Sequence, residues 1–255
     1  MSGYTYIDVY GRDGVLWIVF NRPDKLNSFN MGMMQEVIDA TKSSEGYWAI
    51  VYTGRGRFFS AGIDLYEVSQ STSADEVGEI FSKLGEMFNT IFNVDKPIVI
   101  ALNGDAYGGG AEFIWLGDIV IATKDAKIGW AEAKWGLIPP LLPLLGSMSM
   151  GIGRAQLIAY TSGVVAAKDL EHFGVISMLV DSPDELENSV SKVLDMVKAN
   201  SPFAFRSLKK YFRMIKLTHL ASYGVSELER LSRSMSVVAA AKEFVRSKKQ
   251  PTYEW

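Results

Sequence analysis

Short apolar runs that alternate with helical segments constrain the fold of this chain more than any other feature. The runs occupy residues 49–53, 97–102 and 119–122 and are apolar almost without interruption. Between the first two lies a segment with helical spacing, which begins at Ser73 in a Ser-x-x-Glu capping box. Strands that are apolar on both faces and alternate with helices are typical of parallel βαβ units. We therefore predict an α/β fold.

The first part of the chain departs from this pattern. Residues 5–9 and 15–20 predict two strands with a turn at 11–14 between them, so a hairpin is expected. Residues 31–41 then have the apolar spacing of a helix.

The last part of the chain is expected to be mostly helical from residue 144 onward, with one helix opening at Ser201-Pro202. No repeat or low-complexity linker divides the chain. We expect a core domain over residues 1–200 and a helical C-terminal region over residues 201–255, either packed on the core or swapped out from it.

Composition excludes several classes of protein. The chain has 255 residues, 48% apolar and 22% charged, which suits one large globular domain and not a disordered chain. It has no cysteine, and hence no disulfide, zinc knuckle or thiol nucleophile. Its two histidines, His172 and His219, offer little to a metal cluster or a serine–histidine dyad. No apolar stretch reaches the length of a membrane span and no leader is recognisable, so we expect a cytoplasmic protein without a membrane partner.

The charge is unevenly distributed. Residues 201–255 carry 11 lysines and arginines against 4 acidic residues, while residues 1–200 carry 15 against 25. Such a basic end can bind nucleic acid, an anionic small molecule or an acidic face of a neighbouring subunit, or it can be a solvated helix face. Charge alone leaves these alternatives open.

Two glycine turns are the sharpest local features. Gly108–Gly110 lie between the run at 97–102 and a helical segment, where free backbone N–H groups can face a ligand. A second turn occupies residues 60–65. Two such turns can each offer one backbone N–H to the same oxygen, as an oxyanion hole requires, although each alone can be an ordinary loop. The dinucleotide-binding, P-loop and serine nucleophile-elbow patterns are all missing from the sequence.

Two glutamates stand in apolar surroundings. Glu112 follows the triple glycine, and Glu132 lies among small and aromatic residues. Each is either a solvated or structural residue or a buried acid with a raised pKa, and a buried pair can serve as general acid and base.

Taken together, these segments resemble the crotonase family, the enoyl-CoA hydratase/isomerase superfamily. Residues 21–27 are similar to its Asn-Arg-Pro-x-x-x-Asn segment, and residues 59–65 to its Phe-x-Ala-Gly-x-Asp-Leu turn. Further matching segments follow in the family's order at 96–104, 108–112, 117–119 and 132–139. The resemblance implies a crotonase-like spiral of ββα units over the core domain. It also implies a helical C-terminal region that forms trimers, commonly paired into hexamers.

The resemblance also implies roles for individual residues. The oxyanion-hole donors fall on the backbone N–H groups of Ile63 and Gly109, and the acid–base pair on Glu112 and Glu132. The positions that resemble substrate and coenzyme A contacts are Lys25, Leu26, Asn27, Ala61, Gly62, Asp64 and Tyr253. No metal and no permanently bound cofactor is implied, because coenzyme A arrives as part of the substrate; nucleic acid is not an implied partner.

The implied function is that of an enoyl-CoA hydratase, which adds water in syn fashion to a 2-enoyl-CoA through a stabilised enolate. Two departures from the family's pattern favour an alternative. Pro139–Leu145 is an apolar run where hydratases have Pro-Gly-x-Gly-Gly-Thr-Gln, and Trp130 stands where they usually have glutamine. A drier pocket suits a Δ3,Δ2-enoyl-CoA isomerase in which Glu132 alone moves the proton. A non-catalytic acyl-CoA-binding protein would need only the glycine turns.

Overall fold

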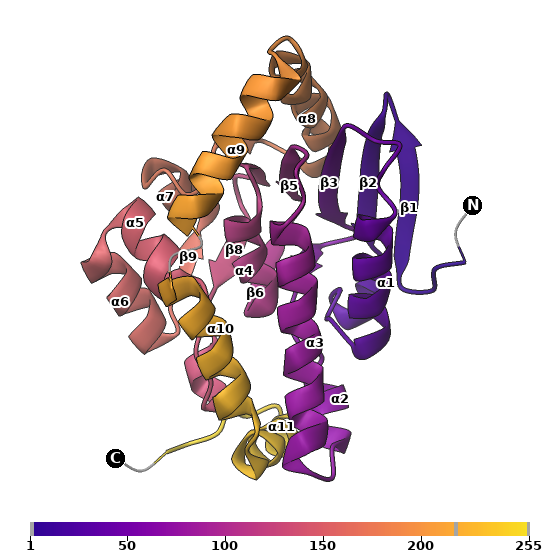
Figure 1. Cartoon of the computed structure of the whole chain (residues 1–255). Coiled ribbons are helices and arrows are strands. Elements are labelled where there is room, and N and C mark those ends of the chain that lie inside the picture. Colours follow the sequence, from indigo (N-terminus) through magenta and orange to yellow (C-terminus); the bar gives the residue numbers. More distant parts are fainter. Residues whose placement is uncertain (1–2, 217–218, 254–255) are drawn as a thin grey trace.

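The computed structural model describes residues 3–216 and 219–253, and two sheets organise this part of the chain (Figure 1). The larger sheet has the strand order β1-β2-β3-β5-β7-β10. Its strands are β1 (Ile7–Arg12), β2 (Val15–Phe20), β3 (Ala49–Gly54), β5 (Ile98–Leu102), β7 (Ile119–Thr123) and β10 (Met178–Val180). All neighbours from β2 onward are parallel, which confirms the α/β prediction; β1 is antiparallel to β2 and forms the predicted hairpin.

The smaller sheet has the order β4-β6-β8-β9 and explains how the chain repeats. Its strands are β4 (Phe58–Ser60), β6 (Asp105–Tyr107), β8 (Lys127–Gly129) and β9 (Val164–Ala166). β4, β6 and β8 follow β3, β5 and β7 of the larger sheet in turn, so each repeat contributes one strand to each sheet. This is the expected ββα architecture.

Four helices fill the space between and beside the sheets. They are α1 (Met31–Lys42), α2 (Leu65–Gln70), α3 (Ala74–Phe92) and α4 (Gly109–Leu116). The hydroxyl of Ser73 accepts from the N–H of Glu76 at the start of α3, as predicted, but the Glu76 carboxylate accepts from Thr72 instead of closing the box. Every residue of α4 is buried, and Phe113 at its centre packs against a ring of aromatic side chains. The first turn of α4 is therefore held rigidly.

The remaining helices lie after residue 141, in agreement with the predicted helical part. They are η3 (Leu142–Gly146), α5 (Ser147–Met150), α6 (Ile152–Thr161), α7 (Ala167–His172), α8 (Pro183–Lys198), α9 (Pro202–Lys216), α10 (His219–Ser232) and α11 (Met235–Ser247). α8 covers one face of the larger sheet through Leu186, Val190 and Leu194. α10 lies beside α3, and α11 packs against α2 (Figure 1). Two short 3-10 turns, η1 (Pro23–Lys25) and η2 (Glu132–Trp135), carry the candidate site residues Lys25 and Glu132.

One detail of the sequence prediction was wrong, and two short strands were missed. β1 extends to Arg12, so the hairpin turn is confined to Asp13-Gly14, both with positive φ. β9 and β10 lie within the part predicted to be mostly helical. They were missed because strands of three residues are too short to show an alternating pattern.

The predicted boundary at residue 200 lies in the connection between α8 and α9. The outermost residues of the two predicted ranges, 1–2 and 254–255, fall outside the described residues. In the part of the chain that the structure describes, no helix is long and apolar enough to cross a membrane.

Candidate active site

The two glycine turns meet at one edge of the smaller sheet. β4 and β6 are parallel neighbours, so the turns that follow them emerge side by side. Gly62 and Gly108 both have positive φ, at +82° and +51°, where a side chain would be strained. A Cβ atom at Gly62 would lie 2.9 Å from the backbone nitrogen of Gly109. The backbones of the two turns are therefore in direct contact.

At this contact the backbone N–H groups of Ile63 and Gly109 have no acceptor among the described residues. Phe29 pairs with the residues flanking Ile63: its N–H donates to Gly62 O at 2.7 Å and its oxygen accepts from Asp64 N at 3.0 Å. The N–H of Ile63 consequently points to the other side. Gly109 is the first residue of α4, and its N–H has no intrahelical acceptor. Within residues 3–216 and 219–253 neither N–H donates to a protein acceptor, which is the state that an oxyanion site needs.

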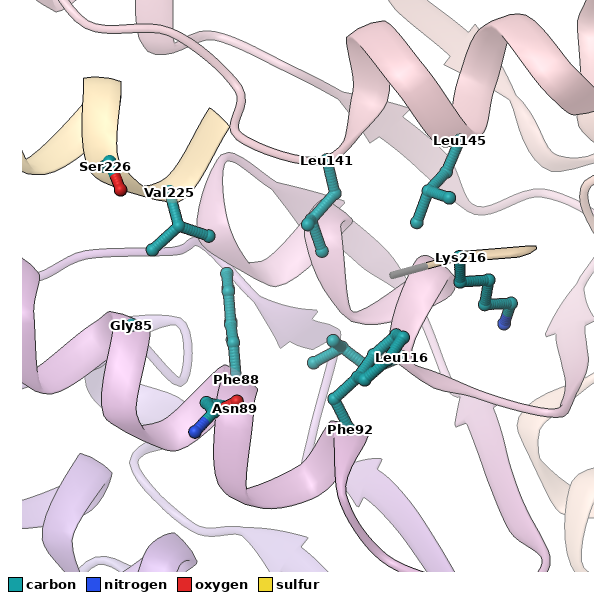
Figure 2. Close-up of a pocket in the computed structure, with 10 residues that line it drawn as sticks. All are labelled: Gly85, Phe88, Asn89, Phe92, Leu116, Leu141, Leu145, Lys216, Val225 and Ser226. Carbon is teal, nitrogen blue, oxygen red and sulfur yellow. The ribbon is translucent and has the colours of Figure 1, made fainter. Parts of the chain in front are cut away.

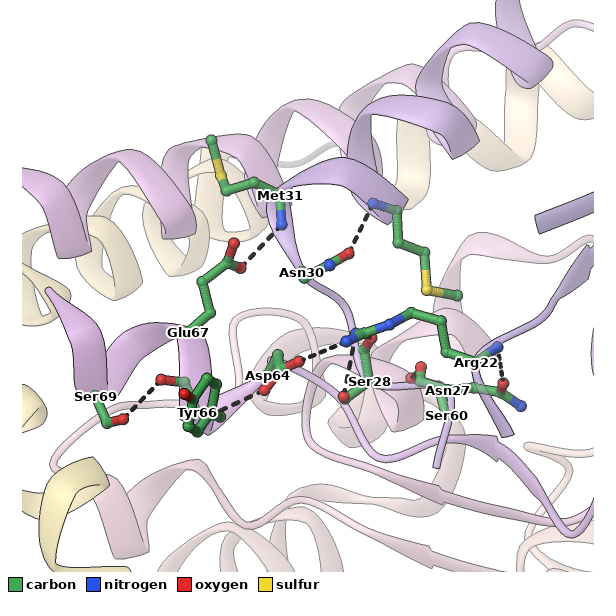
Figure 3. A network of polar contacts seen from close by, with 11 residues as sticks. Arg22, Asn27, Ser28, Asn30, Met31, Ser60, Asp64, Tyr66, Glu67 and Ser69 are labelled. Carbon is green, nitrogen blue, oxygen red and sulfur yellow. Dashed lines mark hydrogen bonds and ion pairs between the residues drawn. The ribbon is translucent and has the colours of Figure 1, made fainter. Parts of the chain in front are cut away.

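A network of polar contacts holds the Gly62 turn in place (Figure 3). The Ser60 hydroxyl donates to Asn27 O at 2.8 Å and accepts from Gly62 N at 3.1 Å. The Arg22 guanidinium pairs with the Asp64 carboxylate at 3.0 Å, and both side chains are nearly buried. The Asp64 carboxylate also caps α2 by accepting from Tyr66 N. The turn is thus fixed before any ligand arrives.

Several predicted ligand contacts have side chains that are occupied by this framework. Asn27 is completely buried, and its amide donates to Phe58 O at 2.7 Å and to Arg55 O at 3.0 Å. Asn27 and Asp64 therefore position the turn, and a ligand could meet these residues only through their backbone. Lys25 and Leu26 are exposed beside them, while Ala61 is half-buried and Gly62 is buried.

Tyr253 lies beside the site within its own chain. Its hydroxyl donates to Lys134 O at 3.1 Å, and its ring remains half exposed. Lys134 belongs to η2, the turn that carries Glu132. The structure therefore places this predicted residue next to the candidate site, on the same subunit.

The two glutamates are buried beside the glycine turns. Glu112 is fully buried on α4, and Glu132 is 7% exposed at the start of η2. A Cβ atom at Gly108 would lie 3.7 Å from Glu132 Oε1, which places this carboxyl against the turn. Leu141 N donates to Glu112 Oε2 at 2.7 Å, whereas Glu112 Oε1 and both Glu132 oxygens have no partner among the described residues. Three buried carboxyl oxygens are therefore available to a substrate or a water molecule.

Burial changes the acidity of both groups. Loss of solvation raises the pKa of Glu132 to about 7. Burial, together with the charge of Glu132, raises the pKa of Glu112 well above its ordinary value. Because the charge of Glu132 acts on Glu112, the two carboxyls titrate as a pair, and burial moves their proton exchange toward neutral pH. The arrangement can both accept and donate a proton there.

Part of the apolar run at 139–145 lines a cavity of about 270 Å³ between α3, α4, η3 and α10 (Figure 2). Leu141 and Leu145 lie in its wall together with Phe88, Phe92 and Leu116. Leu141 also joins this wall to the site, because its N–H holds Glu112. Trp115, Trp130 and Trp135 do not line this cavity: Trp115 and Trp130 stack on each other in the core, and Trp135 packs on Phe244.

Sequence reasoning missed two contributors, Arg22 as the partner of Asp64 and the N–H of Leu141 as the partner of Glu112. Arg22 stands inside the matched segment at 21–27, so its side chain could have been considered. The Leu141 contact carried no sequence signal beyond the altered run at 139–145.

Comparisons with known proteins agree on one family. The family model described as enoyl-CoA hydratase/isomerase matches residues 11–251. The short-chain-enoyl-CoA hydratase of Clostridium acetobutylicum is 29% identical over 76% of this chain and 75% of its own length. The trans-2-decenoyl-[acyl-carrier-protein] isomerase of Streptococcus mutans is 27% identical over 94% of this chain and 95% of its own. An enoyl-CoA hydratase structure from Mycobacterium avium subsp. paratuberculosis superposes with a TM-score of 0.83, at 23% identity over 98% of this chain and 99% of that one.

The repeated ββα fold with its paired glycine turns is thus that of a crotonase-type protein. The chain belongs to the enoyl-CoA hydratase/isomerase family.

Proposed function

We propose that this protein is an enoyl-CoA hydratase, which adds water in syn fashion to a 2-enoyl-CoA. The observation that carries the proposal is the pair of buried carboxyls, Glu112 and Glu132, beside two unpaired backbone N–H groups. Both carboxyls keep oxygens free of protein partners. Syn hydration moves two protons on one face of the substrate, one taken from water and one delivered to C2. An enzyme that catalyses it can use one carboxyl for each proton.

The proposed chemistry follows from the arrangement. The N–H groups of Ile63 and Gly109 hold the thioester oxygen and stabilise the negative charge that develops on it as the enolate forms. The ionised carboxyl of the pair takes a proton from water as it attacks C3, and the protonated carboxyl delivers a proton to C2. Coenzyme A enters as part of the substrate, with the exposed Lys25 and Leu26 at the surface beside the turn.

The test is direct. The protein is incubated with crotonyl-CoA and, separately, with a 3-enoyl-CoA, and the absorbance of the conjugated thioester is followed. Loss of absorbance with crotonyl-CoA supports hydration. A gain with the 3-enoyl-CoA and no change with crotonyl-CoA favours the isomerase. Inactivity on both, with acyl-CoA still bound, favours a non-catalytic binding protein.

One observation favours the isomerase as the second candidate. The wall beside Glu112 is built from the buried leucines Leu141, Leu142 and Leu145, which bring no polar side chain toward the pair. Such a wall limits the access of water, which an isomerase must exclude. The Streptococcus mutans relative, whose match covers nearly the whole chain, is an isomerase by name.

We also propose that the protein assembles as a trimer, or as a hexamer of paired trimers. α9 exposes large apolar side chains that nothing in the described chain covers, including Phe203 at 74% and Phe212 at 58% exposure. A second copy of the chain is the natural occupant of such a face. Sedimentation equilibrium should give three or six times the 28.2 kDa mass of one chain, and a monomer would contradict the proposal.

A further inference from the structure

Buried polar atoms without a partner gather at one place in this molecule. Among the described residues six such side-chain atoms occur, and five belong to Glu112, Glu132, Trp115 and Trp130. Folded proteins rarely leave buried polar groups unpaired, and exceptions need an explanation. The three carboxyl oxygens are explained by the proposed acid–base role. The two indole N–H groups are not.

Trp130 is held beside the helix that carries Glu112. The side chain is fully buried and stacks on Trp115 with 6.0 Å between ring centroids and 27° between planes. Trp115 lies three residues after Glu112 on α4, and Trp130 lies two residues before Glu132. The stack therefore joins the elements that carry the two glutamates.

The contact between Trp130 and Glu112 is only partly made. The indole N–H lies near enough to the carboxyl to lower its pKa, although burial outweighs this effect. No hydrogen bond is closed between them, because both Trp130 Nε1 and Glu112 Oε1 are without a partner. The other oxygen of Glu112 already accepts from Leu141 N. Hydrogen bonds of this kind are often long in the free enzyme and tighten when the substrate binds.

We propose that Trp130 is a positioning residue, whose indole N–H closes onto Glu112 Oε1 when an acyl-CoA occupies the site. Together with Leu141 N it gives the carboxylate two donors, one on each oxygen. The inference rests on the proposed acid–base role of Glu112 and assigns to Trp130 a part in it.

Two donors favour the ionised form of a buried carboxyl, which burial otherwise keeps protonated. Glu132 is the one charged group that acts on Glu112 among the described residues, since α3, β4, β5, β6 and η3, which pack against α4, bring no other charge to bear on it. The indole N–H is therefore well placed to decide how readily Glu112 takes up a proton from water.

The first test compares Trp130→Phe with Trp115→Phe in crotonyl-CoA hydration. Both variants lose a buried indole of the same stack, so the second controls for packing. We expect Trp130→Phe to lower kcat about 10-fold with little change in KM, and to move the acidic limb of the pH profile of kcat, which reports the substrate complex, to higher pH. Trp115→Phe should leave that limb in place. Equal limbs in the two variants, or an unmoved limb in Trp130→Phe, would overturn the proposal while leaving hydratase activity established.

A second measurement does not depend on turnover. The indole 15N–1H resonance of Trp130, assigned by its loss in Trp130→Phe, should move downfield when unreactive butyryl-CoA is added, and the Trp115 resonance should move less. If the wild-type protein binds butyryl-CoA and the Trp130 resonance does not move, Trp130 does not close on Glu112 and the proposal fails. Absence of hydration in the wild type, in contrast, would contradict the proposed function and not this contact.

Discussion

Gly224 of α10 lies against the carbonyl oxygen of Pro140, so closely that a Cβ atom at position 224 would stand 2.0 Å from it. The next residue, Leu141, donates its N–H to Glu112. The C-terminal helix α10 thus fixes the position of the segment at Pro140, whose next residue holds the Glu112 carboxyl. Close packing at Gly224 connects the C-terminal helices to the proposed acid–base pair.

We predict that Gly224→Ala lowers kcat/KM by about 10-fold or more, because α10 and the segment at Pro140 must move apart and the Leu141 N–H then leaves Glu112. Steady-state kinetics with crotonyl-CoA measures the effect. Gly153→Ala is the matched control, since a Cβ at this helical glycine of α6 meets nothing within 4 Å. It should keep full activity and be slightly more stable. Full activity in Gly224→Ala would show that the contact does not matter.

Glu132→Gln is expected to remove nearly all turnover, whether the enzyme is a hydratase or an isomerase. The amide cannot exchange the proton, and general acid–base catalysis contributes about 10²–10⁴-fold. The partner variant Glu112→Gln separates the two reactions: a hydratase should lose a similar factor, while an isomerase that relies on Glu132 should lose much less. Initial rates with a 2-enoyl-CoA and a 3-enoyl-CoA give both numbers. A Glu132→Gln protein that works as well as the wild type would refute the assignment of this residue.

The raised pKa of Glu132 also predicts how stability depends on pH. Near pH 4 the folded and unfolded chains both hold the proton, so burial of this group carries no electrostatic penalty. As the pH rises from about 4.5 to about 7 the unfolded chain ionises first, and the folded state loses stability. The difference between these two pKa values corresponds to a loss of roughly 3 kcal/mol in the free energy of unfolding.

Because glutamine does not ionise, Glu132→Gln should unfold at a higher temperature than the wild type at pH 8 and at a similar one at pH 4, with a gap of several degrees at pH 8. Thermal unfolding followed by circular dichroism at both pH values measures this. Glu79→Gln, at an exposed position of α3, controls for the loss of one negative charge. A gap that is the same at pH 4 and pH 8 would contradict the buried, raised state of Glu132.

Gly62→Ala tests the paired N–H groups. The new Cβ would lie 2.7 Å from Tyr107 O and 2.9 Å from Gly109 N, at a φ of +82° that alanine disfavours. The two turns must separate, and the loss of a well-placed oxyanion donor costs about 10²–10³-fold in kcat. Gly109→Ala is the control, because its Cβ would point at Leu84 and Phe29 in ordinary contact, 3.6 Å away or more. If both variants turn over equally well, the thioester oxygen binds elsewhere.

What the sequence predicted well rests on local signals. The parallel strands β3, β5 and β7 are uninterrupted apolar runs, and α3 begins at the predicted Ser73. The glycine turns were located because only glycine serves where two backbones touch, and Glu112 and Glu132 because a carboxylate is conspicuous in an apolar segment. Each signal lies within a few residues of the feature that it predicts.

What the sequence could not predict depends on contacts between distant segments. The hydrogen bond from Leu141 to Glu112 joins residues 29 apart, and any residue other than proline at position 141 has the same backbone N–H to offer. The stack of Trp115 on Trp130 likewise depends on how α4 meets the segment after β8. Aromatic residues near a motif gave no indication of which would line the cavity and which would pack in the core.

The basic end of the chain lies beside the site and offers a last prediction. α11 packs against η2 through Phe244 and Trp135, with 5.1 Å between ring centroids, and Tyr253 returns to Lys134. Lys248 and Lys249, which follow α11, are exposed and so are free to meet the phosphates of coenzyme A.

We predict that changing both Lys248 and Lys249 to alanine raises the Kd for butyryl-CoA several-fold at low salt. The effect should shrink toward 0.5 M salt, where screening shortens the range of exposed charges to a few ångströms. Lys168 and Lys192, exposed on α7 and α8, form the control pair, since their replacement removes the same charge away from η2. Titration calorimetry at two salt concentrations measures both double variants, and equal Kd values for them would leave the charge of the C-terminal end without a part in binding.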